Sequence, residues 1–209
     1  MAAGIREGNG TMLIDYYMSH NSPWAYLGSA RFADIAARAG AEVHVRPVDF
    51  GRIFPQSGGL PLPKRAPQRQ AYRLVELGRW RDHLGVPITL HPKAFPSPEG
   101  LRVGMVLALR ESEGHAAAMR LSHGFMAALW ADDADINDAA VLDGVAARLG
   151  FDGPRLRERA QDPAIAALFD ADTERAMQAG VFGAPSYVVD GEIFWGQDRL
   201  DFLARRLGL

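Results

Sequence analysis

The most informative stretch of the chain is Tyr16–Gly28, YYMSHNSPWAYLG. It continues an apolar and aromatic run that starts at Met12, and such a run is typical of a buried strand. Pro23 then suits the first turn of a helix, where its missing N–H would have had no partner. Apolar residues recur at near-helical spacing up to Gly40, so we predict a strand, a turn at Ser22 and a helix.

A second strand is predicted over 41–50, where valines alternate with polar residues. The segment 51–69 is rich in Pro and Gly, and we expect a long, functional loop there. Near the C-terminus, two short apolar runs meet at Asp190-Gly191, which is a hairpin signature. The remaining segments are rich in Ala, Leu and Arg and predict helices at 71–84, 98–113, 115–130, 138–149, 154–160, 162–179 and 199–207.

Two β-rich ends around an α-rich middle indicate an α/β fold with a helical insertion. At 209 residues the chain is long enough to bury a full core as one unit. We predict a sheet domain formed by 12–53 and 178–209, a helical insertion domain over 54–177 and a flexible tail over 1–11.

Charge and cysteine content exclude several classes of function. The 23 Lys+Arg and 25 Asp+Glu give a net charge of -2, which argues against a nucleic-acid partner. With no cysteine, the chain cannot supply a disulfide, a thiolate metal site or a cysteine nucleophile. The six histidines show no metal-ligand spacing, so no metal is expected. No signal-peptide pattern or long apolar run occurs, and we expect a soluble cytoplasmic protein without a membrane span.

Ser22 is the first candidate site residue. It stands at a strand-to-helix turn, where unpaired N–H groups and the positive end of the helix dipole favour an anion. Its hydroxyl can either cap the helix or donate a hydrogen bond to such an anion, and the local sequence favours neither. Trp24 and Tyr26 suit the core or a pocket wall.

Two further motifs lie near the C-terminus. In GVFGAPSY, 180–187, Pro185 directly precedes a strand. Its peptide bond is either cis, leaving the backbone of Ala184 free to pair with an extended ligand, or trans at a strand edge. In FWGQDRL, 194–200, a strand ends and a helix begins, so amides there could hold a carboxylate and Asp198 an ammonium group. The alternative is helix capping by Asp198.

Taken together, SPWAYLG, GVFGAPSYVVDGEIFWGQDRL and the helical middle resemble the 2-hydroxychromene-2-carboxylate isomerases and the related kappa-class glutathione transferases. The resemblance starts at about residue 12 and covers the rest of the chain. It implies a thioredoxin-like fold with an all-helical insertion domain, as in DsbA-type oxidoreductases, and glutathione as the cofactor. Ser22 and Ala25 would replace the two cysteines of a Cys-Pro-His-Cys motif, so dithiol exchange is lost.

The same resemblance assigns roles to the three motifs. Ser22 would be catalytic, donating a hydrogen bond to the glutathione sulfur and favouring its thiolate. The backbone of Ala184, before Pro185, would pair with the cysteine of the tripeptide. Gln197 and Asp198 would hold the γ-glutamyl end.

A fourth block resembles the relatives less closely. They carry a lysine in a Pro-x-Lys-x-x-Tyr context that reaches glutathione, where this chain has Arg69, which keeps the charge but changes the geometry. Tyr72 and Trp24 are the candidates to bind the substrate. The relatives also commonly have Ser/Thr-Gly-Asn where this chain ends the same triplet with Gly59, so an asparagine near the ligand is missing.

The implied reaction converts 2-hydroxychromene-2-carboxylate to trans-o-hydroxybenzylidenepyruvate in the catabolism of naphthalene-like aromatics, through reversible addition of the glutathione thiolate to an enone. For stabilising the enolate oxygen, Arg69, Tyr72 and Trp24 are candidates only. One alternative is a kappa-like glutathione transferase or peroxidase, and another is a non-catalytic DsbA-like protein that binds a thiol or peptide. The partner is expected to be a small aromatic keto acid, and the assembly a homodimer.

Overall fold

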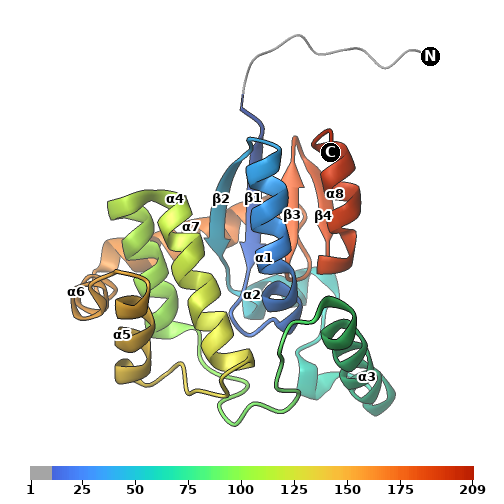
Figure 1. Ribbon diagram of the computed structural model, residues 1–209, viewed down its shortest axis with the longest axis horizontal. Coiled ribbons are helices and arrows are strands. Elements are labelled where there is room, and N and C mark those ends of the chain that lie inside the picture. The colour runs from blue at the N-terminus through green and yellow to red at the C-terminus, as the bar shows by residue number, and fades with distance from the viewer. Residues whose placement is uncertain (1–10) are drawn as a thin grey trace.

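The computed structural model describes residues 11–209, which form a four-stranded sheet with helices on both faces (Figure 1). The predicted tail, 1–11, lies almost entirely outside the described residues. The strands are β1 (Leu13–Met18), β2 (Glu42–Pro47), β3 (Ser186–Val189) and β4 (Glu192–Trp195). In the order β2-β1-β3-β4, β1 is parallel to β2 and antiparallel to β3, and β4 is antiparallel to β3.

The helices separate into those around the sheet and those beside it. The bounds are α1 (Pro23–Arg38), α2 (Phe50–Ser57), α3 (Pro67–Leu84), α4 (Gly100–Trp130), α5 (Ala139–Arg148), α6 (Gly153–Arg159), α7 (Pro163–Gln178) and α8 (Leu200–Arg206), with 3-10 turns at Leu62–Lys64 and Gln197–Arg199. In Figure 1, α1 and α8 cover the near face of the sheet, α4 to α6 lie to the left and α3 lies at the lower right.

Alternation along β1 divides the core between the two faces of the sheet. Ile14, Tyr16 and Met18 belong to the large core cluster that includes residues of α1, α4 and α8. Tyr17 points to the other face, into a smaller cluster with Ile53 of α2 and residues of α7. This period of two is what a strand buried on both faces requires.

The order strand, helix, strand, several helices, two strands and a helix confirms the predicted thioredoxin-like fold class. The predicted hairpin is also confirmed, because Asp190 (φ 50) and Gly191 (φ 81) form the turn between β3 and β4. The division into a sheet domain and an insertion domain at 53/54 and 177/178 remains a proposal. α4, inside the proposed insertion, packs on both α1 and β2.

The prediction of a loop over 51–69 is wrong at both ends, because α2 occupies Phe50–Ser57 and α3 begins at Pro67. Asp49 caps this helix, its Oδ1 accepting from Gly51 N at 2.7 Å, and Gly58 ends it with φ 73. Pro55 lies inside α2, where a proline normally argues against a helix. The two helices predicted on either side of Gly114 form one element, α4, with a kink at that glycine (φ 86, ψ 176).

Within residues 11–209, none of the helices combines the length and the apolar character that a membrane span needs.

Candidate active site

The three sequence motifs meet at one edge of the sheet, the lower edge as drawn in Figure 1. β1 and β4 end there and β3 begins there, because β3 is antiparallel to both of its neighbours. Ser22 follows β1, Pro185 precedes β3, and Gln197 follows β4. Residues more than 160 positions apart in the chain are therefore neighbours in space.

Ser22 is the N-cap of α1, with φ -94 and ψ 109. Its Oγ accepts a hydrogen bond from Ala25 N at 3.1 Å, so the capping interaction is present. The hydroxyl also donates to the carbonyl oxygen of Ala184 at 3.1 Å, which links the first motif to the second. One hydroxyl thus serves as acceptor for the helix and keeps a rotatable donor directed at the facing loop.

A hydrogen bond between backbone atoms links the second motif to the third. The Ala184–Pro185 peptide bond is cis, one of the two alternatives that the sequence left open. Pro185 O accepts from Gly196 N at 2.9 Å, directly before the 3-10 turn that carries Gln197 and Asp198. Two hydrogen bonds, from the Ser22 hydroxyl to Ala184 O and from Gly196 N to Pro185 O, therefore connect the three motifs.

Gln197 and Asp198 differ sharply in exposure. Gln197 is buried; a Cβ on Gly28 would lie only 2.7 Å from the Gln197 Cβ, and Gln197 Oε1 accepts from Arg31 Nη1 at 3.1 Å. Asp198 is exposed, and its Oδ2 accepts from Arg199 Nη1 at 2.7 Å. The Asp198 carboxylate is exposed to solvent, whereas Gln197 is 1% exposed.

The residues predicted on α3 and at Trp24 are less closely tied to Ser22. Trp24 is partly buried and packs against the large core cluster. Arg69 is exposed, and Tyr72 is 58% exposed with the Arg79 guanidinium 6.0 Å from its ring centre. Across residues 11–209, no hydrogen bond, ion pair or ring contact joins Arg69 or Tyr72 to Ser22.

Gly59, where the relatives commonly have asparagine, has a local steric role. A Cβ at this position would lie 2.5 Å from Phe54 Cδ1, the side chain of the helix α2 that the sequence did not predict. An asparagine would therefore need Phe54 to move.

A buried polar cluster behind Ser22 was not foreseen from the sequence. It joins the segment before Ser22 to the start of α4: Ser19 Oγ donates to Glu99 Oε1, and Asn21 Nδ2 donates to Ser97 O at 2.7 Å. Arg102 Nη2 donates to Glu99 Oε2 at 3.3 Å. The remaining members are His20, whose Nε2 lies 3.1 Å from Ser122 Oγ, and Trp130, whose Nε1 donates to His20 O at 2.9 Å.

In this cluster the pKa values of His20 and Glu99 are both shifted, and different causes dominate the two shifts. Burial lowers the pKa of His20, whose Nδ1 lies 3.8 Å from Glu99 Oε2, too far for a hydrogen bond. Burial acts to raise the pKa of Glu99, but His20, Arg102 and Ser19 together outweigh it and hold that pKa below its ordinary value. A neutral His20 and an ionised Glu99 therefore support the Ser22 turn at neutral pH.

Arg73 is a second residue that the sequence did not single out. Its guanidinium carbon lies 5.5 Å from the ring centre of Phe95 and 6.0 Å from that of Trp130. Trp130 is the residue whose indole N–H is bonded to the backbone just before Ser22. A basic side chain of α3 thus lies over an aromatic pair attached to the proposed catalytic turn.

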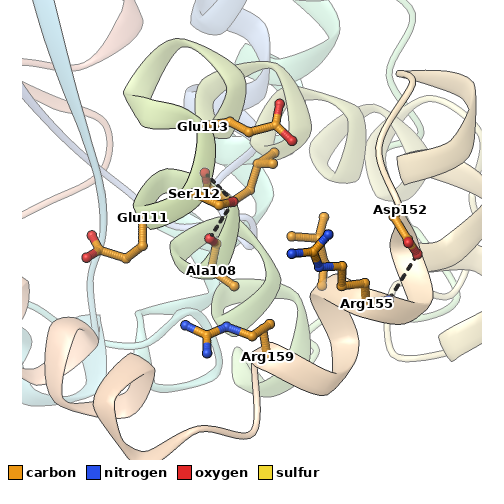
Figure 2. Close-up of a pocket in the computed structure, with 9 residues that line it drawn as sticks. Ala108, Glu111, Ser112, Glu113, Asp152, Arg155 and Arg159 are labelled. Atoms are coloured by element: carbon orange, nitrogen blue, oxygen red, sulfur yellow. Dashed lines mark hydrogen bonds between the residues drawn. The ribbon is translucent and has the colours of Figure 1, made fainter.

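Two surface cavities are formed by other elements, and the second borders the third motif. One, of about 360 Å³, lies between α4 and α6; its Ser112 hydroxyl donates to Ala108 O and its Asp152 carboxylate caps α6 (Figure 2). Because these groups satisfy local backbone atoms, this cavity is explained by helix packing. The other, of about 530 Å³, lies between β4 and α8 and includes the half-exposed Trp195 and Phe202. Within the described part of the chain, no three His, Cys, Asp or Glu side chains are grouped to hold a metal.

Comparisons with known proteins agree on the family. Residues 13–208 match the model of the DSBA-like thioredoxin domain. The chain is 31% identical to a 2-hydroxychromene-2-carboxylate isomerase of Sphingobium xenophagum, over 92% of this chain and 96% of the relative. It is 26% identical to the protein of the same name from Pseudomonas putida, over 94% of this chain and 95% of the relative.

Solved structures give the same result for the fold. A 2-hydroxychromene-2-carboxylate isomerase superposes with a TM-score of 0.79 at 25% identity, covering 94% of this chain and 95% of that one. The cytosolic disulfide reductase DsbM from Pseudomonas aeruginosa, solved with GSH, superposes with a TM-score of 0.65 at 18% identity, covering 95% and 100%. The second likeness concerns the fold alone.

Proposed function

The chain belongs to the 2-hydroxychromene-2-carboxylate isomerase family of DsbA-like thioredoxin domains and is an isomerase, and from this premise we propose that it works with glutathione. The proposed reaction converts 2-hydroxychromene-2-carboxylate to trans-o-hydroxybenzylidenepyruvate. The assignment of 2-hydroxychromene-2-carboxylate as the substrate is supported by the name that both relatives carry. The assignment of glutathione as the cofactor is supported by the hydrogen bonding of Ser22.

The observation that carries the proposal is the pair of hydrogen bonds at Ser22. Its Oγ is held by Ala25 N at the start of α1, while its hydroxyl hydrogen faces Ala184 O across the gap between the motifs. Rotation about the Cβ–Oγ bond is enough to redirect that hydrogen from the carbonyl to a bound sulfur. No backbone movement is needed for Ser22 to become a donor to a thiolate.

The groups around Ser22 fit a thiol tripeptide. The amides at the N-terminus of α1 favour an anion at the sulfur position. The exposed Asp198 carboxylate suits the ammonium of a γ-glutamyl group, and the backbone of Gln197 lies beside it. Arg69, exposed on α3, is the proposed partner of a terminal carboxylate.

When bound, glutathione would supply a thiolate that adds reversibly to the ring-opened enone, so that the C=C bond becomes a single bond able to rotate. Ser22 keeps the sulfur ionised: a thiol pKa of about 8.5 falls by about one to two when a hydrogen bond worth about 1.5–3 kcal/mol favours the anion. The same donor stabilises the departing sulfur, so Ser22 acts in both directions. Trp24 and Tyr72 are proposed to contact the aromatic substrate.

We also propose a cytoplasmic homodimer. A cytoplasmic location fits a protein that draws on the cytosolic glutathione pool. The exposed apolar side chains of Phe182, Trp195 and Phe202 around β4 and α8 offer an apolar surface for self-association. Light scattering on the purified protein measures the mass directly.

The proposal is tested with Ser22→Ala and a matched control, Ser112→Ala, whose hydroxyl bonds only to its own helix. Glutathione binding is followed by calorimetry, and turnover with 2-hydroxychromene-2-carboxylate. Ser22→Ala should lower kcat/KM by about 10²- to 10³-fold, as loss of a preorganised donor does, and lower stability by about 1 kcal/mol through the lost cap. Ser112→Ala should change neither kcat/KM nor glutathione binding.

Three outcomes would contradict the proposal. If the wild-type protein binds no glutathione, glutathione is not the cofactor. If turnover is unchanged in Ser22→Ala, the serine has no catalytic role. Rapid conjugation of 1-chloro-2,4-dinitrobenzene without isomerisation would instead identify a kappa-like transferase.

A further inference from the structure

Arg73 differs from Arg79 and Arg81 on α3 in having no anionic partner within residues 11–209, and from the equally unpaired Arg69 in being partly buried. On the same helix, Arg79 Nη1 donates to Glu76 Oε1 at 2.6 Å and Arg81 Nε to Asp82 Oδ1 at 2.8 Å. For Arg73, no hydrogen bond or ion pair is formed with any of residues 11–209, although the side chain is partly buried. The rings of Phe95 and Trp130 lie within 6.0 Å of its guanidinium carbon.

The position of Arg73 connects it to the proposed catalytic turn. Its guanidinium lies over Phe95 and Trp130, whose ring centres are 5.0 Å apart. Trp130 donates to His20 O at 2.9 Å. The loop that carries Phe95 continues to Ser97, whose O accepts from Asn21 Nδ2 at 2.7 Å. Trp130 is thus bonded directly to the backbone before Ser22, and Phe95 is connected to it through Trp130 and through the loop to Ser97.

α3 also lies at the correct end of the sheet. It packs against α1, the helix that Ser22 caps, and lies at the lower right in Figure 1, near the edge where the three motifs meet. Arg73 is therefore carried by a helix that packs against the one whose N-terminus holds Ser22.

A half-buried cation without a counter-ion is unfavourable in the unliganded protein. Burial, and secondarily the charge of Arg65, lower the pKa of Arg73 to about 10, so the guanidinium still carries its charge at neutral pH. Arg65, which adds to the positive charge, donates its Nε to Leu60 O at 2.7 Å and does not neutralise Arg73. The site gains stability when an anion arrives.

We propose that Arg73 binds the carboxylate of the aromatic keto-acid substrate and so makes the enzyme selective for anionic electrophiles. This inference rests on the proposed isomerase function. A carboxylate accepts two parallel hydrogen bonds from a guanidinium, and that geometry would fix the substrate relative to Ser22. Arg73 is therefore a substrate-binding residue, distinct from Arg69, which is proposed to contact glutathione.

The test separates the carboxylate from the aromatic ring by using two probes, salicylate and its neutral analogue salicyl alcohol. Calorimetry measures both on the wild type, Arg73→Met, Arg73→Lys and the control Arg81→Met, which removes one exposed charge from the same helix. Arg73→Met keeps the apolar stem over Phe95 and Trp130, so the fold is retained.

We expect wild type to bind salicylate at least about tenfold more tightly than salicyl alcohol, and Arg73→Met to lose that preference. The KM for 2-hydroxychromene-2-carboxylate should rise about tenfold to a hundredfold in Arg73→Met, with glutathione affinity unchanged. Arg73→Lys should keep part of the preference for salicylate, because lysine has the positive charge but cannot form the two parallel hydrogen bonds of a guanidinium. Arg81→Met should behave as wild type.

Equal affinity of the wild type for the two probes would overturn the inference, and so would full retention of salicylate binding by Arg73→Met. Either result leaves glutathione binding and Ser22-dependent turnover intact. Failure of the proposed function has a different signature, which is wild type that binds no glutathione whatever its affinity for salicylate.

Discussion

Two polar regions of this molecule, one around Asp172 and one around Ser22, differ in how completely their groups are paired. At Asp172 of α7, Oδ1 accepts from Arg46 Nη1 at 2.6 Å and Oδ2 accepts from Arg110 Nη1 at 2.5 Å. Arg46 Nε also donates to Asp15 Oδ1 of β1 at 2.5 Å, so every charged side chain in this group has a partner of opposite charge. At the Ser22 edge, by contrast, the Ser22 hydroxyl donates to one carbonyl, and Arg73 has no anionic partner within residues 11–209.

The contrast separates structural charges from binding groups. The Asp172 network joins α7 and α4 to strands β1 and β2, and a ligand could enter it only by breaking ion pairs. At the Ser22 edge, Asp198 is exposed and paired only with the exposed Arg199, and the partly buried Arg73 has no anionic partner within residues 11–209. Completeness of pairing therefore distinguishes the two regions better than the number of charges does.

The largest expected effect is a loss of stability when the ion pairs around Asp172 are removed. Asp172→Ala removes the buried carboxylate shared by Arg46 and Arg110, which leaves Arg46 only Asp15 and Arg110 only the more distant Glu111 as anionic partners, and the free energy of unfolding should fall by about 3 kcal/mol. The control is Asp170→Ala, which breaks an exposed pair with Arg52 and should cost no more than about 1 kcal/mol. Urea unfolding measures both; equal losses in the two variants would show that the Asp172 network is not structural.

A smaller loss is expected at Gly196, which joins the second and third motifs. Gly196 has φ 96, and a Cβ there would lie 2.5 Å from Asp198 Oδ1. Gly196→Ala should therefore cost about 1–3 kcal/mol and weaken glutathione binding by displacing the Asp198 carboxylate. Gly78→Ala in α3, where the added methyl meets open space, should instead be neutral or slightly stabilising. Unchanged glutathione affinity in Gly196→Ala would exclude Asp198 from the site.

The smallest effect concerns the pH dependence of the cluster behind Ser22. Burial holds the pKa of His20 below its ordinary 6.5, so the unfolded chain binds a proton more readily than the folded protein. His20 therefore contributes stability above pH 6.5 that is lost as the pH falls through the folded-state pKa. His20→Gln should flatten the decline in urea midpoint between pH 8 and pH 5, whereas the exposed His91→Gln should leave it unchanged. An identical decline in both variants would contradict this assignment.

The parts of the site that could be predicted were those encoded in short motifs. Ser22-Pro23 after a strand, Ala184-Pro185 before one and Asp190-Gly191 between two depend on local chain geometry, and the structure has a helix start, a cis bond and a hairpin turn at these places. The helix α2 was missed because Pro55 and the glycines that follow it suggest a loop, while the capping signal at Asp49 is a single residue.

The parts that could not be predicted depend on contacts between distant segments. Glu99 becomes notable only when Ser19 and Asn21 are beside it, and those residues are about 80 positions away. Arg73 is one of many arginines in the chain, and its lack of an acid partner is a property of the folded arrangement. Sequence patterns therefore predicted the backbone of the site better than the side-chain contacts made between distant segments.

The central claim is that Ser22 stabilises a glutathione thiolate, and ultraviolet titration of the thiolate in the complex tests it most directly. Absorbance near 240 nm is followed against pH for glutathione bound to wild type and to Ser22→Ala. The account predicts a thiol pKa below the ordinary value of about 8.5 in the wild type, and a value about one to two higher in Ser22→Ala, since one charge-assisted hydrogen bond is lost. The same thiol pKa in both complexes would contradict it.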